Sequence, residues 1–183
     1  MSLKPVVAAA ILDDSLPPRL LAARRSYPPA LEGLYELPGG KVEPDEDAAT
    51  ALQREIFEEL GTRIVLEEPL PASGECSGAA SAEVLASTED AGRAPRPVRA
   101  TTPRTERRVC HGGPGFAAWT VTGGRPMWVW LARIAPAAPE PQPGDSHRDL
   151  TWVGLAEALD LPWIPADIPI VEAVLEAVTR SSR

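Results

Sequence analysis

The chain has 183 residues, and its 26 Asp and Glu against 18 Lys and Arg give it a formal net charge of −8. This balance excludes a general nucleic-acid-binding surface, because such a surface needs a basic face that displaces counterions from phosphates. The length predicts one domain built around one hydrophobic core. The two cysteines, Cys76 and Cys110, fit no zinc-finger spacing, so we expect reduced thiols in a cytoplasmic protein.

The first apolar run, VVAAAIL at residues 6–12, predicts a buried strand. It is short for a signal segment and ends in two aspartates. No other run is apolar for long enough to span a bilayer, so we expect no membrane partner. After a double-proline turn, the sequence LLAARR at residues 20–25 predicts a second strand.

A helix is predicted after the turn in the sequence ELPGGKVEP. Asp45 or Asp47 is suited to cap its N-terminus, and Gly61 is suited to a left-handed C-cap. Apolar residues recur at every fourth position, which predicts one face packed on the core. These residues are Ala48, Leu52, Ile56 and Leu60.

Residues 64–66 predict a further strand, after which the hydrophobic pattern is lost. The segment from about 72 to 117 is rich in Ala, Ser, Pro, Gly and Arg, and residues 93–108 hold six arginines against one acid. We expect a flexible insertion, because this composition buries too little apolar surface to offset the entropy of ordering. The alternative is a basic flap that closes over a polyanionic substrate.

The last third of the chain returns to regular patterns. The runs AAWTVTGG and PMWVWLARI predict a hairpin that turns at Gly123 and Gly124. A proline-rich link leads to a short strand, LTWVGL, and residues 166–180 predict an amphipathic helix with Pro169 in its first turn. Strands mixed with two helices predict a layered α/β domain.

Three glutamates crowd the end of the first predicted helix. Glu55, Glu58 and Glu59 stand at i, i+3 and i+4, so their carboxylates share one side of it. Like charges at this spacing destabilise a helix by about 0.2–0.5 kcal/mol per pair. A divalent cation would relieve the repulsion, and carboxylates without nearby His or Cys favour Mg²⁺ or Mn²⁺ over zinc. The alternative is a solvated acidic face.

The spacing around these glutamates resembles the Nudix box of the Nudix hydrolase family. Thr62 stands where an aliphatic residue is usual, and we expect it to be tolerated because it is β-branched. The matching positions are Gly40, Glu46, Arg54–Ile56, Glu58–Glu59 and Gly61.

The resemblance extends to most of the chain outside the insertion and is to the MutT-like branch, which includes 8-oxo-dGTP diphosphatases and CTP pyrophosphohydrolases. The spacing from LLAARR to ELPGGKVEP and the ending PADIPIVEAV carry it. It implies a single Nudix domain over residues 1–183, folded as an α/β/α sandwich around a central mixed sheet. It also implies a cytoplasmic monomer or homodimer that acts on small nucleotides, with no stable nucleic-acid complex.

The activity that the resemblance implies is hydrolysis of a nucleoside triphosphate to the monophosphate and pyrophosphate, with modified or surplus nucleotides as substrates. Two alternatives remain open. One is a Nudix hydrolase of another nucleoside diphosphate derivative, such as a nucleotide sugar, a dinucleotide or an RNA cap. The other is a module that senses a nucleotide without cleaving it.

The resemblance also implies a metal site. The backbone carbonyl of Gly39 and the carboxylates of Glu55, Glu58 and Glu59 would hold Mg²⁺, with Mn²⁺ as the alternative, and Glu55 or Glu58 would activate the attacking water. A fourth acidic ligand near Asp145 is left open, because a serine stands where many relatives have an acid. The neighbouring His147 is interpreted as a loop histidine.

Substrate contacts are implied at both ends of the nucleotide. Arg25 matches a position that touches substrate, and Lys41 follows the turn where phosphate oxygens would lie, although both also fit ordinary surface charge. The base would lie between Asp167 and the segment Glu36, Leu37, Pro38 and Gly39. Asp167 could accept from the amine of cytosine or, when protonated, donate to a carbonyl, and it also fits a helix N-cap. Base preference is therefore left open.

Overall fold

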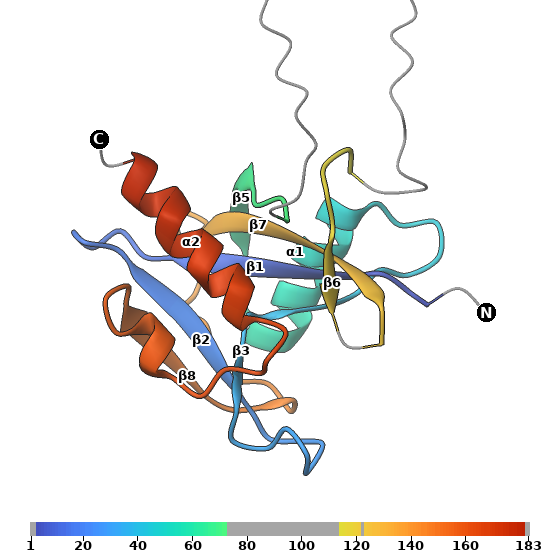
Figure 1. Ribbon diagram of the computed structural model, residues 1–183, viewed down its shortest axis with the longest axis horizontal. Helices are drawn as coiled ribbons and strands as arrows, with labels where there is room; N and C mark the ends of the chain where they lie inside the picture. The colour runs from blue at the N-terminus through green and yellow to red at the C-terminus, as the bar shows by residue number, and fades with distance from the viewer. Residues whose placement is uncertain (1–2, 73–113, 122, 182–183) are drawn as a thin grey trace, which may run out of the picture.

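The computed structural model describes residues 3–72, 114–121 and 123–181. They form one mixed sheet with a helix on each face, and Figure 1 shows α2 in front of the sheet and α1 behind it. In chain order the elements are β1 (Val6–Leu12), β2 (Arg19–Arg25), β3 (Tyr35–Glu36), β4 (Gly39–Lys41), α1 (Ala48–Leu60), β5 (Ile64–Pro69), β6 (Trp119–Val121), β7 (Arg125–Ile134), β8 (His147–Gly154), the 3₁₀ turn η1 (Ala158–Asp160) and α2 (Ile168–Ser181).

Strand β1 lies at the centre of the sheet. It pairs in parallel with β7 along its whole length, from Val6 opposite Met127 to Leu12 opposite Arg133. On its other side it pairs antiparallel with β4 at one end and with β2 at the other. Strands β5 and β6 continue the sheet beyond β7, and β3 and β8 both pair with β2. The predicted mixed sheet is confirmed.

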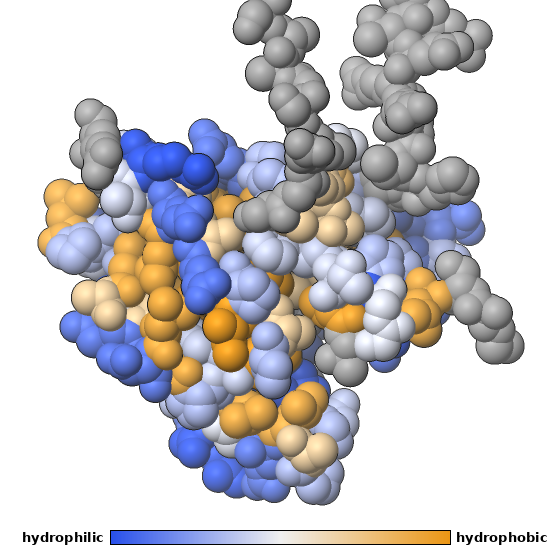
Figure 2. Space-filling view, in the orientation of Figure 1, coloured by the Kyte–Doolittle hydropathy of each residue, from blue (hydrophilic) through white to orange (hydrophobic). Residues whose placement is uncertain are grey.

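The apolar run of β1 reflects burial on both faces of the sheet. Alternate residues Ala8, Ala10 and Leu12 pack in a cluster with the buried face of α2, and the residues between them pack with α1. The small side chains at Ala8 and Ala10 let a helix approach the sheet closely. The polar side of α2 faces solvent, and Figure 2 shows hydrophilic side chains along it. The α/β/α sandwich is therefore confirmed.

Helix α1 has the ends that the sequence predicts. Asp47 caps its N-terminus through hydrogen bonds of 3.0 Å to Oδ1 from the backbone N–H groups of Ala49 and Thr50. Gly61 ends the helix with φ of 64°, a left-handed conformation that glycine adopts without strain. The next residue, Thr62, is fully buried and its hydroxyl donates to the carbonyl of Pro139 at 2.6 Å. Threonine thus fills the usual aliphatic position and also ties α1 to the distant link.

Two strands are longer than the sequence predicts. The strand expected at residues 64–66 extends to Pro69, because β5 resumes pairing with β7 after a register shift. The strand expected at LTWVGL begins at His147, because β8 keeps pairing with β2 across a bulge at Arg24 and Arg25. The predicted hairpin turn and the closing helix that contains Pro169 are confirmed.

Most of the predicted insertion, and both cysteines with it, lies outside the described residues. Within the part of the chain that the structure describes, no helix is long and apolar enough to cross a membrane.

Candidate active site

A cavity of about 390 Å³ opens on the α2 face of the sheet, over the first residues of β1 and β7. Of the predicted substrate and metal residues, it is lined by Arg25, Glu36, Leu37, Gly39, Lys41 and Asp167. Pro38 does not line it, and the carbonyl of Pro38 instead accepts a hydrogen bond of 2.9 Å from the N–H of Ala9. The fold therefore gathers most of the predicted substrate residues around one space.

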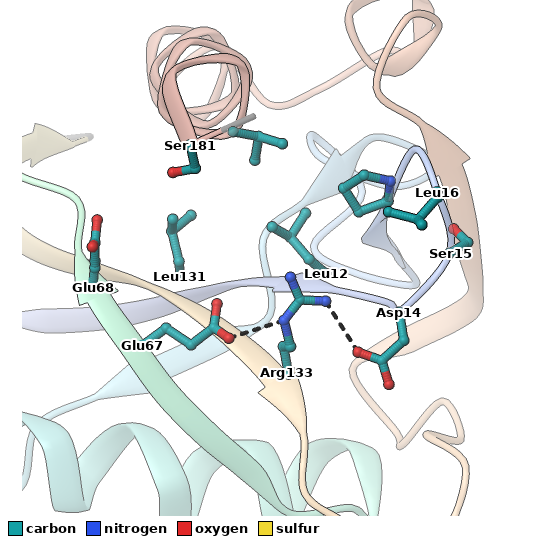
Figure 3. Close-up of a pocket in the computed structure, with 11 residues that line it drawn as sticks. Leu12, Asp14, Ser15, Leu16, Glu67, Glu68, Leu131, Arg133 and Ser181 are labelled. Atoms are coloured by element: carbon teal, nitrogen blue, oxygen red, sulfur yellow. Dashed lines mark hydrogen bonds and ion pairs between the residues drawn. The ribbon is translucent and has the colours of Figure 1, made fainter. Parts of the chain in front are cut away.

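A larger cavity, about 670 Å³, lies near the other end of β1, between β5, β7 and the last turn of α2. Figure 3 shows Arg133 there, held by Asp14 and Glu67 at 3.1 and 2.9 Å. None of the predicted site residues lines this second cavity.

The two glycines expected in a turn lie in strand β4, after a bend at Pro38, and they connect the first cavity to α1. A Cβ at Gly39 would lie 2.1 Å from the backbone oxygen of Val7, and a Cβ at Gly40 would lie 2.2 Å from the Glu55 carboxylate. The first contact is with the backbone of β1, so only glycine fits at position 39, whereas the second is with a flexible side chain that would have to move aside. The missing side chains let β4 pair closely with β1 and let Glu55 approach β4.

Arg54 holds two of the three glutamates. Its Nη1 lies 2.9 Å from Glu55 Oε1 and 3.0 Å from Glu58 Oε2, and its Nη2 donates to the carbonyl of Lys41 at 3.1 Å. It also forms an ion pair with Glu46, at 3.0 and 2.9 Å. One guanidinium therefore fixes the loop before α1 and draws Glu55 and Glu58 together.

The third glutamate lies apart from this ion-pair network. Glu59 Oε2 is buried and has no hydrogen-bond partner among the residues that the structure describes. Burial is the largest effect on its carboxyl and raises its pKa to about 7, a shift that the neighbouring Glu36 and Glu55 increase and His147 opposes. Among residues 3–72, 114–121 and 123–181, no three His, Cys, Asp or Glu side chains already converge as a metal site.

Asp167 closes the cavity at the start of α2. Its side chain is buried and its Oδ2 accepts a hydrogen bond of 2.8 Å from the backbone N–H of Leu37. Burial raises its pKa to about 7, against the opposing effect of that hydrogen bond. Its carboxyl group is therefore partly protonated near neutral pH, so it can both accept and donate hydrogen bonds.

His147 is the residue that the sequence interpretation placed wrongly. It begins β8 and is no loop residue, because Arg25 of β2 pairs with it across the bulge. Its side chain is 1% exposed, and Nε2 lies 3.0 Å from Glu36 Oε1. No sequence pattern reveals the partner of His147, because Glu36 lies 111 positions away in the chain.

Arg125 also lines the cavity, although the sequence analysis did not single it out. It begins β7 and has a buried Nε without a hydrogen-bond partner. Its guanidinium forms no ion pair with any residue that the structure describes. A cationic group is therefore available at the cavity wall opposite β4.

Comparisons with known proteins agree with this architecture. A model of the NUDIX domain matches residues 2–174. The chain is 30% identical over 176 residues to a protein of Escherichia coli K12 described as "CTP pyrophosphohydrolase", covering 96% of this chain and 93% of that one. It is 35% identical over 162 residues to a Mycobacterium tuberculosis protein described as "Putative 8-oxo-dGTP diphosphatase 2", covering 88% and 81% of the two chains.

Solved structures agree as well. The solution structure of the E. coli ORF135 protein superimposes with a TM-score of 0.58 at 29% identity, covering all of this chain and 94% of that one. A NUDIX hydrolase from Nitrosomonas europaea gives a TM-score of 0.61 at 12% identity, with coverage of 100% and 73%, and supports the fold alone.

The fold is an α/β/α sandwich in which the acidic helix α1 lies beside the two glycines of β4, next to a cavity lined by β4. The chain belongs to the Nudix family and is a MutT-like Nudix hydrolase. Nudix hydrolases act on small nucleotide substrates and use divalent metal ions.

Proposed function

We propose that this enzyme is a Mg²⁺-dependent nucleoside triphosphate pyrophosphohydrolase that converts modified or surplus triphosphates to the monophosphate and pyrophosphate. The observation that carries the proposal is the position of the cavity. It is lined at one side by Gly39 and Lys41, next to the glutamate helix, and at the other by Asp167, which suits base recognition. A nucleotide lying between them would present its phosphates to the acidic helix.

The donor set suits a hard divalent cation. Glu55, Glu58 and Glu59 would hold it together with the carbonyl of Gly39, and the unpartnered buried oxygen of Glu59 is the observation that supports the fit. A carboxylate buried without a partner is costly, and a cation would compensate it. When bound, Mg²⁺ or Mn²⁺ neutralises phosphate charge and acidifies water.

The protein's own groups would supply proton transfer and local positive charge. Glu55 or Glu58 would accept the proton of the attacking water, and Arg54 keeps both carboxylates in reach of β4. Arg25 and Lys41 would contact the phosphates. These cations matter because the chain as a whole carries a net charge of −8 and repels polyanions at long range.

Base recognition would rest on Asp167. An ionised carboxylate accepts from the exocyclic amine of cytosine, and a protonated one donates to a carbonyl such as that of guanine. Its pKa of about 7 keeps both forms populated at neutral pH. The two relatives are described by names that refer to CTP and 8-oxo-dGTP. We propose that one of these two base types is the preferred substrate.

The substrates would be free nucleotides in the cytoplasm, bound by a monomer or homodimer without a stable nucleic-acid complex. A strongly acidic chain lacks the basic surface that a nucleic-acid backbone requires, but a few local cations are enough to bind a small anion.

Steady-state kinetics with pyrophosphate detection test the proposal. CTP, dCTP, 5-methyl-dCTP, dGTP and 8-oxo-dGTP are compared with a nucleotide sugar, a dinucleotide and a capped RNA in the presence of Mg²⁺. We expect pyrophosphate from at least one triphosphate, with a kcat/KM well above that of every other class. Monophosphate from the nucleotide sugar with all triphosphates left intact would reject the proposal. Tight binding of a triphosphate without turnover would identify a sensing module instead.

A further inference from the structure

Three neighbouring strands bring three polar residues together at one wall of the cavity. Glu36 of β3 pairs with Ala23 of β2, Arg25 ends β2, and His147 begins β8 opposite Arg25. Arg25 and Glu36 line the cavity, whereas His147 lies behind them and is buried.

Glu36 is held from two sides. Its Oε2 accepts a hydrogen bond from Arg25 Nη1, and its Oε1 lies 3.0 Å from His147 Nε2. Because an ionised carboxylate only accepts, Nε2 carries the hydrogen in the second bond. Because both of its oxygens form hydrogen bonds, the Glu36 carboxylate is fixed in place. It therefore restricts the orientation of the Arg25 guanidinium.

Arg25 is held in turn by Glu36. Its Nε donates to the carbonyl of Tyr27 at 2.9 Å, and the guanidinium lies 5.9 Å from the centre of the Tyr27 ring. Its Nη2 donates no hydrogen bond to any of the described residues. The bonds to Tyr27 and Glu36 therefore set the direction in which the remaining nitrogen, Nη2, can meet a ligand in the cavity.

We propose that His147 is a positioning residue for substrate binding, which acts through Glu36 to fix the guanidinium of Arg25 at the cavity wall. This inference rests on the proposed function, because it requires that the cavity bind the nucleotide. His147 itself would touch neither the substrate nor the reacting atoms.

The chemistry of the position favours this role over simple packing. His147 Nδ1 is buried and finds no hydrogen-bond partner in the described part of the chain, which costs free energy that an apolar side chain of similar size would not. What a histidine adds at this position is the single bond from Nε2 to Glu36. That bond acts on the cavity through Glu36, which lines it, and through Arg25, which Glu36 holds.

Two amide variants separate the bond from the bulk of the ring. In His147→Gln the side-chain amide nitrogen can take the place of Nε2, whereas in His147→Asn it takes the place of Nδ1 and falls short of Glu36. We expect KM for the best triphosphate substrate to rise about tenfold in H147N with kcat changed less than about threefold, because a charged hydrogen bond is lost. H147Q should stay within about threefold of wild type in both constants.

Arg148→Ala is the matched control, because Arg148 is the next residue of β8 but is exposed and paired with Glu32. Thermal melting of every variant tests whether the fold is kept. Equal KM values for H147N and H147Q, or a loss confined to kcat, would overturn the proposal.

A double-mutant cycle tests whether His147 acts through Glu36. In the Glu36→Ala background, adding H147N should change KM less than about twofold, because the shared partner is already gone. Effects that multiply would show that His147 acts by another route, which overturns the proposal.

Binding of CTP and 8-oxo-dGTP, measured by calorimetry with Ca²⁺ in place of Mg²⁺, separates this inference from the proposed function. Failure of the wild type to turn over triphosphates would reject the function. Weaker binding in H147N than in H147Q would still support the positioning role. If the wild type binds neither nucleotide, or both variants bind alike, the inference is wrong.

Discussion

Asp167 Oδ2 accepts a hydrogen bond of 2.8 Å from the backbone N–H of Leu37, which lies 130 positions earlier in the chain. The bond fastens the residue before α2 to the segment before β4. The bond lies at the end of the cavity where the base would bind. Burial of the Asp167 carboxyl raises its pKa to about 7.

We predict that Asp167 makes the fold less stable as pH rises. Because its pKa rises from 3.8 when unfolded to about 7 in the folded protein, the folded state between these values keeps a proton that the unfolded state has lost. Stability from this group is fully present below about pH 4 and declines by about 1.4 kcal/mol per pH unit up to about pH 7. Asp167→Asn should remove this decline.

Urea unfolding of wild type and D167N at pH 5 and pH 8 measures the effect. D167N should gain free energy of unfolding relative to wild type at the higher pH, and the control Asp160→Asn, an exposed site in η1, should not. A difference between D167N and wild type that is the same at both pH values would contradict the assignment.

Glu59→Gln should abolish most turnover and leave the fold intact. The substitution removes a charge that a divalent ion would need, but it keeps the size of a side chain whose buried oxygen has no partner to lose. We expect kcat to fall about 100-fold or more. The matched control is Glu172→Gln on the exposed side of α2. Kinetics with a Mg²⁺ titration check the result, and unchanged kcat in E59Q would exclude Glu59 from the metal site.

The two glycines of β4 should respond differently to alanine. A Cβ at Gly39 meets the backbone of β1, which cannot move away, so Gly39→Ala should destabilise the fold by several kcal/mol. A Cβ at Gly40 meets the flexible Glu55 side chain, so Gly40→Ala should fold and lose turnover. Thermal melts paired with kinetics distinguish them. A G40A variant that melts as early as G39A would show that Glu55 cannot yield.

Arg125→Ala should weaken substrate binding, because its guanidinium lines the cavity and forms no ion pair with any residue that the structure describes. We expect a rise of about tenfold in KM. Arg133→Ala is the control on the same strand, since Arg133 lies at the second cavity and is paired with Asp14 and Glu67 (Figure 3). R133A should keep KM and lose about 1 kcal/mol or less of stability. Equal KM changes in both variants would indicate a general charge effect.

The sequence predicts local features of the fold well, because each depends on residues close together in the chain. The caps Asp47 and Gly61 and the hairpin turn at Gly123 and Gly124 follow from side-chain chemistry and backbone freedom alone. The two-sided burial of β1 follows from its unbroken apolar run.

The parts of the site that the sequence does not reveal depend on strand pairing. The bond between Glu36 and His147 joins residues 111 positions apart, and it requires the bulge that pairs Arg25 with His147. The helical spacing of Glu55, Glu58 and Glu59 predicts that they share a face, but it does not predict that their surroundings differ. Glu55 and Glu58 both form ion pairs with Arg54, whereas Glu59 is buried near His147.

The most direct test of the central claim is product analysis of CTP and 8-oxo-dGTP turnover by the purified enzyme, with and without Mg²⁺. We predict monophosphate and pyrophosphate in equal amounts from at least one of them, only when the divalent ion is present. Release of inorganic phosphate with a nucleoside diphosphate, or turnover that persists in excess chelator, would contradict the account.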